Sequence, residues 1–220
     1  MTNMTKYIIG VLAILILGAV GYVLYGRIQA QPVAPPTLPP PALPVTHTYA
    51  SSTFSLIYAD GFTVDENYRY EGVPNKPVSG VKFIIPGAMA TGTNLAAHSG
   101  VSVESLPRAK TCTADIYFYE DVRAEYVTVG SRVWSIASTS GVGAGNLYEE
   151  TVYALKDSKP CIALRYFIHS GNIGNYPPGT VAEFNRGALL AEFDKIRDSF
   201  ATVGAQDASW GATSAPPAIQ

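Results

Sequence analysis

The amino-acid sequence predicts an α+β protein, in which an antiparallel sheet carries a C-terminal helix packed on one face and a single transmembrane helix precedes the domain. Three observations support this prediction: a long apolar run near the N-terminus, a series of short strand patterns divided by turn residues, and one helical apolar stripe near the C-terminus. The expected organisation is a cytoplasmic N-terminus (1–6), a transmembrane signal anchor (7–25), a proline-rich linker (26–45), a globular domain (46–203) and a disordered tail (204–220).

Residues 7–25 form an apolar run without a single charge. At about 1.5 Å per residue a helix of this length reaches roughly 28 Å, which is close to the hydrocarbon thickness of a bilayer. A cleaved signal peptide is the alternative, but its apolar region is usually only about 7–15 residues long. The best cleavage site, after Ala30, would also place the bulky Ile28 at position −3. We therefore expect an uncleaved, single-pass membrane anchor.

The two cysteines, Cys112 and Cys161, are the only ones in the chain. An even pair in a chain that otherwise avoids cysteine predicts a disulfide formed in an oxidising compartment. The alternative is two buried thiols in a cytosolic domain. Flanking charge decides little, because Lys6 precedes the run and Arg27 follows it. The cysteines therefore favour a C-terminal domain in the periplasm or the extracellular space.

The linker and the charge balance limit the classes of partner. Residues 31–44 are half proline, which favours an extended polyproline spacer, with recognition of its P-x-x-P spacings as the alternative. The globular part has a slight excess of acidic residues and no basic stripe, so we expect no nucleic-acid partner. The membrane, reached through residues 7–25, is the one partner that the sequence predicts directly.

Eight short segments show strand patterns bounded by turn residues. They are residues 54–58, 62–64, 81–85, 101–106, 125–129, 132–139, 147–155 and 161–169. The last four follow one another through short links, which predicts an antiparallel meander with a hairpin at Gly130-Ser131 and a flexible glycine-rich loop at 141–146. Both faces of 161–169 carry branched or aromatic residues, which predicts a central strand. Residues 110–119 fit either a strand or a short helix, and we favour the helix.

A helix closes the domain. Thr180 and Glu183 match the T-x-x-E capping box. Apolar residues then recur at alternating spacings of four and three, which predicts one buried stripe facing the sheet. They are Leu189, Phe193, Ile196, Phe200 and Val203.

The layout of residues 54–203 resembles that of PsbP/Mog1-like domains, which are sheets flanked by helices. Three stretches are similar to an uncharacterised group of bacterial envelope proteins with a single anchor: GNLYEET (145–151), PCIALRYFIH (160–169) and NYPPG (175–179). The resemblance implies a location in a bacterial envelope, with the anchor in the inner membrane. That group has no established activity, so the resemblance implies no site residue.

No motif predicts a catalytic site, a metal site or a cofactor. The glycine-rich stretch 141–145 lacks the third glycine of a dinucleotide fingerprint, because Asn146 stands there, and it lacks the lysine of a phosphate-binding loop. The H-E-x-x-H and D-x-D-x-D-G patterns of metal sites and the G-x-S-x-G elbow of hydrolases do not occur.

The most distinctive polar residues fall on adjacent predicted strands and the loop beside them. They are Tyr148, Glu149, Arg165, His169, Asn172, Asn175 and Tyr176. Tyrosine and arginine are frequent anchors of interfaces, so this group predicts a binding patch for an envelope protein or a glycan. The alternative for Arg165 is an ion pair with a glutamate across the sheet.

We therefore expect a non-catalytic, membrane-anchored extracytoplasmic interaction module. The alternative is an envelope hydrolase with its site near His169, which requires a pocket there with a carboxylate or hydroxyl in reach of the imidazole. A third interpretation is a structural part of a larger membrane assembly, although the span lacks the G-x-x-x-G face that often packs helices together.

Overall fold

A computed structural model describes residues 3–29 and 44–203 of the chain. Residues 30–43 of the predicted linker and the predicted tail lie outside the described residues. The chain divides into an N-terminal unit up to Leu43 and a globular unit from Pro44 onwards, and each is described by itself.

The N-terminal unit contains one helix, α1 (Asn3–Gln29). Within it, Tyr7–Tyr25 is long and apolar enough to cross a membrane, although a signal sequence would pass the same test. The large apolar side chains of this stretch are exposed. The helix therefore agrees with the predicted anchor in length and character.

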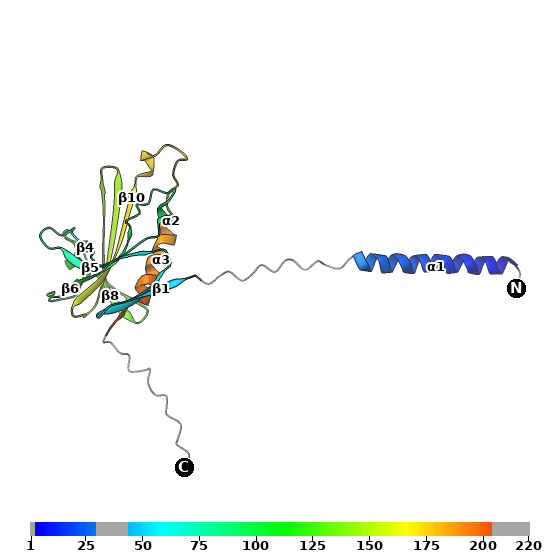
Figure 1. The fold of residues 1–220 in the computed structure, drawn as a ribbon, viewed down its shortest axis with the longest axis horizontal. Helices are drawn as coiled ribbons and strands as arrows, with labels where there is room; N and C mark the ends of the chain where they lie inside the picture. Colours follow the sequence, from blue (N-terminus) through cyan, green and yellow to red (C-terminus); the bar gives the residue numbers. More distant parts are fainter. Residues whose placement is uncertain (1–2, 30–43, 204–220) are drawn as a thin grey trace, which may run out of the picture. The chain divides into compact units, whose positions relative to one another are not determined.

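The globular unit is built on a large antiparallel sheet with the strand order β3-β5-β6-β10-β9-β8-β7, to whose β5 the short β4 also pairs (Figure 1). Its strands are β3 (Thr63–Asp65), β4 (Arg69–Tyr70), β5 (Val78–Ile84), β6 (Gly100–Leu106), β7 (Glu125–Val129), β8 (Arg132–Gly143), β9 (Asn146–Leu155) and β10 (Cys161–Gly171). The last four form the predicted meander, and β10 lies between β6 and β9 as a central strand.

A second sheet has the order β1-β2-β11, with β1 at Thr46–Ala50, β2 at Phe54–Ala59 and β11 at Ala201–Thr202. The turn at Asp60-Gly61 connects β2 to β3, but these two strands enter different sheets. Three short helical turns complete the connections: α2 (Gly87–Ala90), η1 (Ala114–Tyr117) and η2 (Ile173–Asn175). The first of them follows Pro86, and η1 lies inside the segment predicted as a short helix.

The predicted flexible loop at 141–146 is wrong. Strand β8 continues to Gly143, and the hairpin closes through Ala144 and Gly145, which both have positive φ (48° and 79°). A two-residue turn of this hand matches the twist of the paired strands, so it extends the hairpin.

The closing helix α3 (Arg186–Ser199) begins later than predicted. Its N-cap is Asn185, whose side chain accepts a hydrogen bond from the backbone N–H of Ala188. The capping box at Thr180 and Glu183 is therefore wrong, because the Thr180 hydroxyl instead donates to the carbonyl of Pro177. The predicted apolar stripe is buried as far as Phe200, whereas Val203 lies beyond the helix and is exposed.

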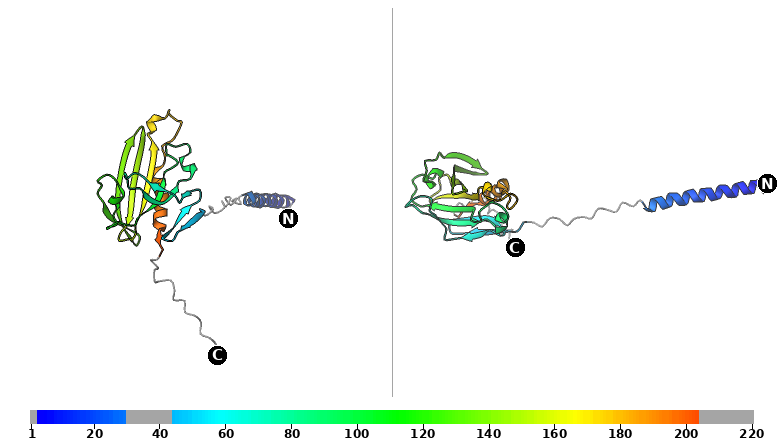
Figure 2. Two further views of the ribbon diagram at one scale, coloured as in Figure 1. Left: turned by 60° about the vertical axis from the view of Figure 1, so that its left-hand side comes forward. Right: turned by 90° about the horizontal axis from the view of Figure 1, so that it is seen from above.

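The large sheet has two covered faces (Figures 1 and 2). We call the face against α3 and the small sheet the helix face; there Tyr166 meets Phe193 and Trp134 meets Phe200, at ring separations of 5.3 and 6.0 Å. The opposite face, here the loop face, is covered by β4, η1 and their flanking segments and has its own apolar cluster. The Cys112–Cys161 disulfide joins the segment before η1 to the start of β10 on this face.

Candidate functional site

Three segments that contain no Asp, Glu, Lys or Arg meet at one end of the globular unit. The segments are 83–103, 133–148 and 166–182, and all charged residues of the domain lie outside them. Hydrogen bonds link the parts that meet: the N–H of Ala96 donates to the carbonyl of His169, and the N–H of Asn172 donates to that of Gly145. We call the surface formed by 90–100, 138–148 and 168–182 the uncharged end. Figure 1 shows the β8–β9 hairpin and the segment after β10 projecting there.

Asn94 holds this end together. It is buried, and its side chain donates to the carbonyl of Gly171 (2.8 Å) and accepts from the N–H of Phe184 (2.9 Å). Its backbone N–H donates to Ala182, and its carbonyl accepts from Gly171. One side chain therefore joins the segment before β6 to the two ends of the β10–α3 connection.

Four rings gather on the loop face at this end. His169 stacks on Tyr148, its cross-strand partner, with ring centroids 4.5 Å apart and planes 15° apart. His98 lies beside His169 at 4.7 Å, and also beside Phe167 at 5.8 Å. We call Tyr148, His169, His98 and Phe167 the ring cluster. His98 is exposed and the other three are partly exposed, so the cluster offers aromatic surface to solvent.

The two histidines of the ring cluster share a hydrogen bond, in which His169 Nδ1 and His98 Nε2 are 2.8 Å apart. Only one proton fits between these nitrogens, so at least one of them must carry a lone pair. Burial lowers the pKa of His169, and burial together with the charges of His169 and Lys82 lowers the pKa of His98. The other nitrogen of His169, Nε2, is buried and has no hydrogen-bond partner among the described residues.

Arg165 does not join the predicted binding patch. Its side chain is fully buried on the loop face, where it forms two hydrogen bonds with Glu104 (2.8 and 3.0 Å) and pairs with Glu150. It also lies 3.5 Å from the ring centroid of Tyr70, whose hydroxyl donates to Glu150. The alternative, an ion pair across the sheet, is the arrangement found. Burial alone would lower the pKa of Arg165, but the Glu104 carboxylate, with that of Glu150, raises it.

Lys82 connects this ionic cluster to the ring cluster. It is buried on β5, with its ammonium 4.8 Å from the ring centroid of Phe167 and 5.3 Å from that of Tyr68. Burial lowers its pKa, and the nearby Glu104 carboxylate partly offsets this effect. Cation–π contacts of this kind stabilise a charge that has few polar neighbours.

Glu149 points to the opposite face from Tyr148, since neighbours on a strand alternate. Its carboxylate accepts from Arg186 at the start of α3 (2.6 and 2.9 Å). Asn172, Asn175 and Tyr176 do lie at the uncharged end, where the Asn175 amide donates to the carbonyl of Gly145 (2.9 Å). The structure therefore brings Tyr148, His169, Asn172, Asn175 and Tyr176 to one end and separates Glu149 and Arg165 from them.

Sequence reasoning missed Asn94 and did not join His98 to His169. Asn94 and His98 lie in the irregular connection between α2 and β6, where no sequence periodicity predicts which side chains face the sheet. Glu104 and Glu150 were also missed, because each lies on a strand whose pairing with β10 is set by tertiary register.

The hydrolase alternative requires a carboxylate or hydroxyl partner for the His169 imidazole. Among residues 3–29 and 44–203, the imidazole has a hydrogen bond to His98 and no other, and the nearby Ser99 hydroxyl bonds to the His169 backbone instead. The described residues also contain no group of three or more His, Cys, Asp or Glu placed to hold a metal ion.

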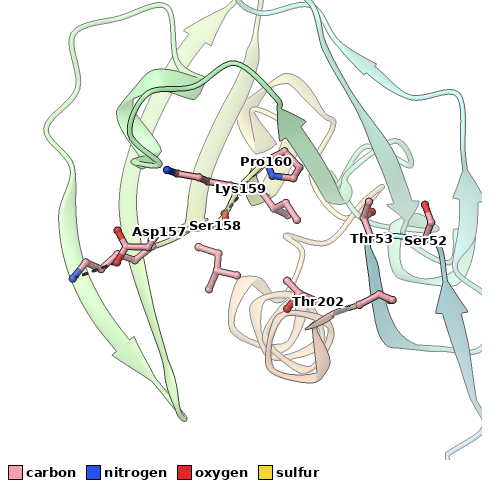
Figure 3. Close-up of a pocket in the computed structure, with 11 residues that line it drawn as sticks. Ser52, Thr53, Asp157, Ser158, Lys159, Pro160 and Thr202 are labelled. Carbon is pink, nitrogen blue, oxygen red and sulfur yellow. Dashed lines mark hydrogen bonds and ion pairs between the residues drawn. The ribbon is translucent and has the colours of Figure 1, made fainter. Parts of the chain in front are cut away.

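A cavity of about 360 Å³ lies at the other end of β10 (Figure 3). The turn 156–160 forms one wall, Ser52 and Thr53 form another, and Thr202 lies between them. An adjoining cavity of about 260 Å³ shares Thr53, Pro160 and Ile162 with it. None of the residues predicted as a binding patch lines either cavity.

Comparisons with known proteins add no functional assignment. No family model matches the chain, and no curated protein matches it. A crystal structure from Bacteroides thetaiotaomicron VPI-5482, determined at 1.50 Å, is similar to it with 14% sequence identity and a TM-score of 0.36. The match covers 68% of this chain and 44% of that one, so the chain spans less than half the length of the protein it matches.

Proposed function

We propose that this chain is a membrane-anchored extracytoplasmic module that binds another component of the bacterial envelope, a protein or a glycan, without catalysing a reaction. The observation that carries the proposal is the ring cluster, whose partly exposed rings lie on three segments that contain no Asp, Glu, Lys or Arg. Exposed aromatic residues are frequent anchors of binding surfaces. Because the His169 imidazole has no acidic or hydroxyl partner among the described residues, the geometry supports binding better than hydrolysis.

The proposed location is the inner membrane, crossed once by residues 7–25, with the domain in the periplasm or outside the cell. Two features support it: the length and apolar character of Tyr7–Tyr25, and a disulfide of the kind that persists in oxidising compartments. The resemblance to single-anchor envelope proteins and to PsbP/Mog1-like domains stays a prediction.

The first test is photo-cross-linking of the full chain in intact envelopes. A photo-reactive amino acid replaces Tyr148 in one variant and the exposed Lys195 of α3 in the control variant. We expect a dominant, saturable adduct from position 148 and none from position 195. The absence of an adduct at position 148, or turnover of an envelope substrate by the purified chain, would contradict the proposal.

The second test is the location of the domain. Externally added protease should digest the domain in spheroplasts, where the outer barrier is removed and the inner membrane is intact. Protection of the domain under these conditions would place it in the cytoplasm and overturn the proposed topology.

A further inference from the structure

We infer that the uncharged end binds a different protein through apolar contacts and uncharged hydrogen bonds, with the β8–β9 hairpin tip inserted into the partner. This inference rests on the proposed function and adds to it the extent of the surface and the class of the partner.

Charge is the first argument. No Asp, Glu, Lys or Arg lies in any of the three segments that form this end, whereas the rest of the domain has charges of both signs. Charged residues are depleted from the buried centres of protein interfaces and found at their rims. Here Glu149 and Arg186 form an ion pair at the margin, which fits such a rim. Nucleic acids, phosphorylated polymers and anionic lipid headgroups need exposed cations, and the three segments contain no Lys or Arg; the nearby Lys82 is buried, and Arg186 is paired with Glu149.

Exposed apolar side chains are the second argument. Val142 is 84% exposed at the hairpin tip, and its cross-strand neighbour Leu147 is also exposed. Ile173 and Tyr176 are exposed on the adjacent connection. Burying aliphatic side chains against a protein removes apolar surface from water, whereas the hydroxyl-covered surface of a neutral glycan would not. The observations therefore favour a protein.

Composition is the third argument. The hairpin tip STSGVGAGNLY (138–148) and the connection SGNIGNYPPGT (170–180) are rich in Ser, Gly, Asn and Tyr. Antibody binding loops have the same bias, because tyrosine supplies contact area and the small polar residues supply adaptable hydrogen bonds. In this domain the loops are fixed rather than free, since Asn94 and Asn175 bond the segments to one another.

The hairpin tip combines an exposed surface with a hollow. Residues 140–145 are exposed on both faces of the hairpin, and a cavity of about 310 Å³ beside them is lined by residues 142–147 and Asn172. A partner protein can therefore contact the exposed tip and place a side chain in this hollow. A second copy of this chain is the outcome that the experiment must exclude.

The experiment uses the full chain in intact envelopes, with the photo-reactive residue at Tyr148 as reporter. A second substitution then adds one charge, either Val142→Asp at the tip or Val127→Asp on β7, an exposed strand valine outside the uncharged end. Circular dichroism of both purified variants verifies the fold. We expect Val142→Asp to lower the adduct yield by about tenfold or more, because an unpaired charge would be buried, and Val127→Asp to lower it less than about twofold.

Two further readouts identify the partner. The adduct should be a single species whose added mass is removed by protease and resists glycosidases. Its yield should change less than about twofold between roughly 0.05 and 1 M NaCl, because contacts without charge are not screened.

The outcomes separate this inference from the proposed function. An adduct that contains a glycan or a second copy of this chain, or one that is lost in high salt or insensitive to Val142→Asp, overturns the inference and leaves a binding module at position 148. No adduct from position 148 overturns both.

Discussion

Arg165 shows how one buried charge organises the loop face. The guanidinium lies among two carboxylates, the ring of Tyr70 and the carbonyl of Tyr117, which accepts a hydrogen bond at 2.9 Å. Such a network satisfies both its charges and its hydrogen bonds. Removing one partner leaves the remaining charges buried without a counter-charge. This loss of folding free energy is larger than the net stabilisation that the intact network provides.

We predict that Arg165→Met lowers the free energy of unfolding by about 3–5 kcal/mol, because Glu104 and Glu150 lose their counter-charge. The control is Lys195→Met, which removes an exposed ion pair with Glu192 and should cost less than about 1 kcal/mol. Denaturation of the full chain in detergent, followed by the fluorescence of the buried Trp134, measures both. Equal stability of the two variants would mean that the ion pairs of Arg165 with Glu104 and Glu150 do not stabilise the fold.

The His98–His169 pair predicts a pH dependence. The pKa values of both imidazoles are lowered in the folded chain, so below about pH 6.5 the unfolded chain binds more protons than the folded one. The stability contributed by the neutral pair is therefore present above about pH 6.5 and is lost as the pH falls through the lowered pKa values. Lys82 and the ring of Tyr148 are the charged and titratable side chains that face the pair.

Denaturation midpoints at pH 7.5 and 5.5 test this prediction, with an expected decrease at the lower pH. His169→Gln should reduce the decrease, whereas Lys195→Gln, which changes an exposed residue of α3, should preserve it. A midpoint that rises on acidification would exclude the pair as the cause.

At the scale of elements, the start of α3 is set by tertiary contacts and not by the local sequence motif. Thr180 and Glu183 satisfy the spacing of a capping box, yet the chain at 177–180 turns back through hydrogen bonds to Pro177. Asn94 then ties Ala182 and Phe184 to the sheet, so the helix begins only at Arg186. Asn185 is therefore the N-cap, because it directly precedes Arg186, the first residue of the helix.

We predict that Asn185→Ala destabilises the chain by about 1 kcal/mol, since the N–H of Ala188 loses its acceptor. Thr180→Ala at the position of the sequence motif should cost a few tenths of that, because Thr180 is exposed and outside the helix. Thermal unfolding of the two variants under identical conditions measures the difference. A larger effect at Thr180 would mean that the helix begins where the motif stands.

At the scale of the whole molecule, the disulfide links the loop face to the central strand. Cys112 and Cys161 are 49 residues apart, and both are buried. Closing a loop of about 50 residues removes roughly 4 kcal/mol of conformational freedom from the unfolded chain in the entropy model, and measured effects are commonly smaller.

We predict that replacing both cysteines by serine lowers the free energy of unfolding by about 2–4 kcal/mol. Reduction of the wild-type chain should produce a comparable loss, which separates the cross-link from the effect of the serine hydroxyls. Because both cysteines are buried, envelopes are denatured before alkylation, and without reductant neither cysteine should be labelled. Labelling of both in freshly opened cells would place the domain in a reducing compartment.

Local patterns in the sequence determined most of the secondary structure of this protein. The uncharged run at 7–25 predicts a span-length helix, alternating apolar residues predict most of the strands, and the stripe from Leu189 to Phe200 predicts the buried face of α3. Each depends on the period of one element, which the sequence displays directly. The pairing of Cys112 with Cys161 was also predictable, because the chain has no other cysteine.

Only the tertiary structure decided which side chains share a site. Arg165 is buried because the register of β6 and β9 brings Glu104 and Glu150 to its side of the sheet. His98 meets His169 because Asn94 and its neighbours fold an irregular connection against the end of β10. These contacts join residues up to 90 positions apart, as between Asn94 and Phe184, and no local period encodes such a meeting.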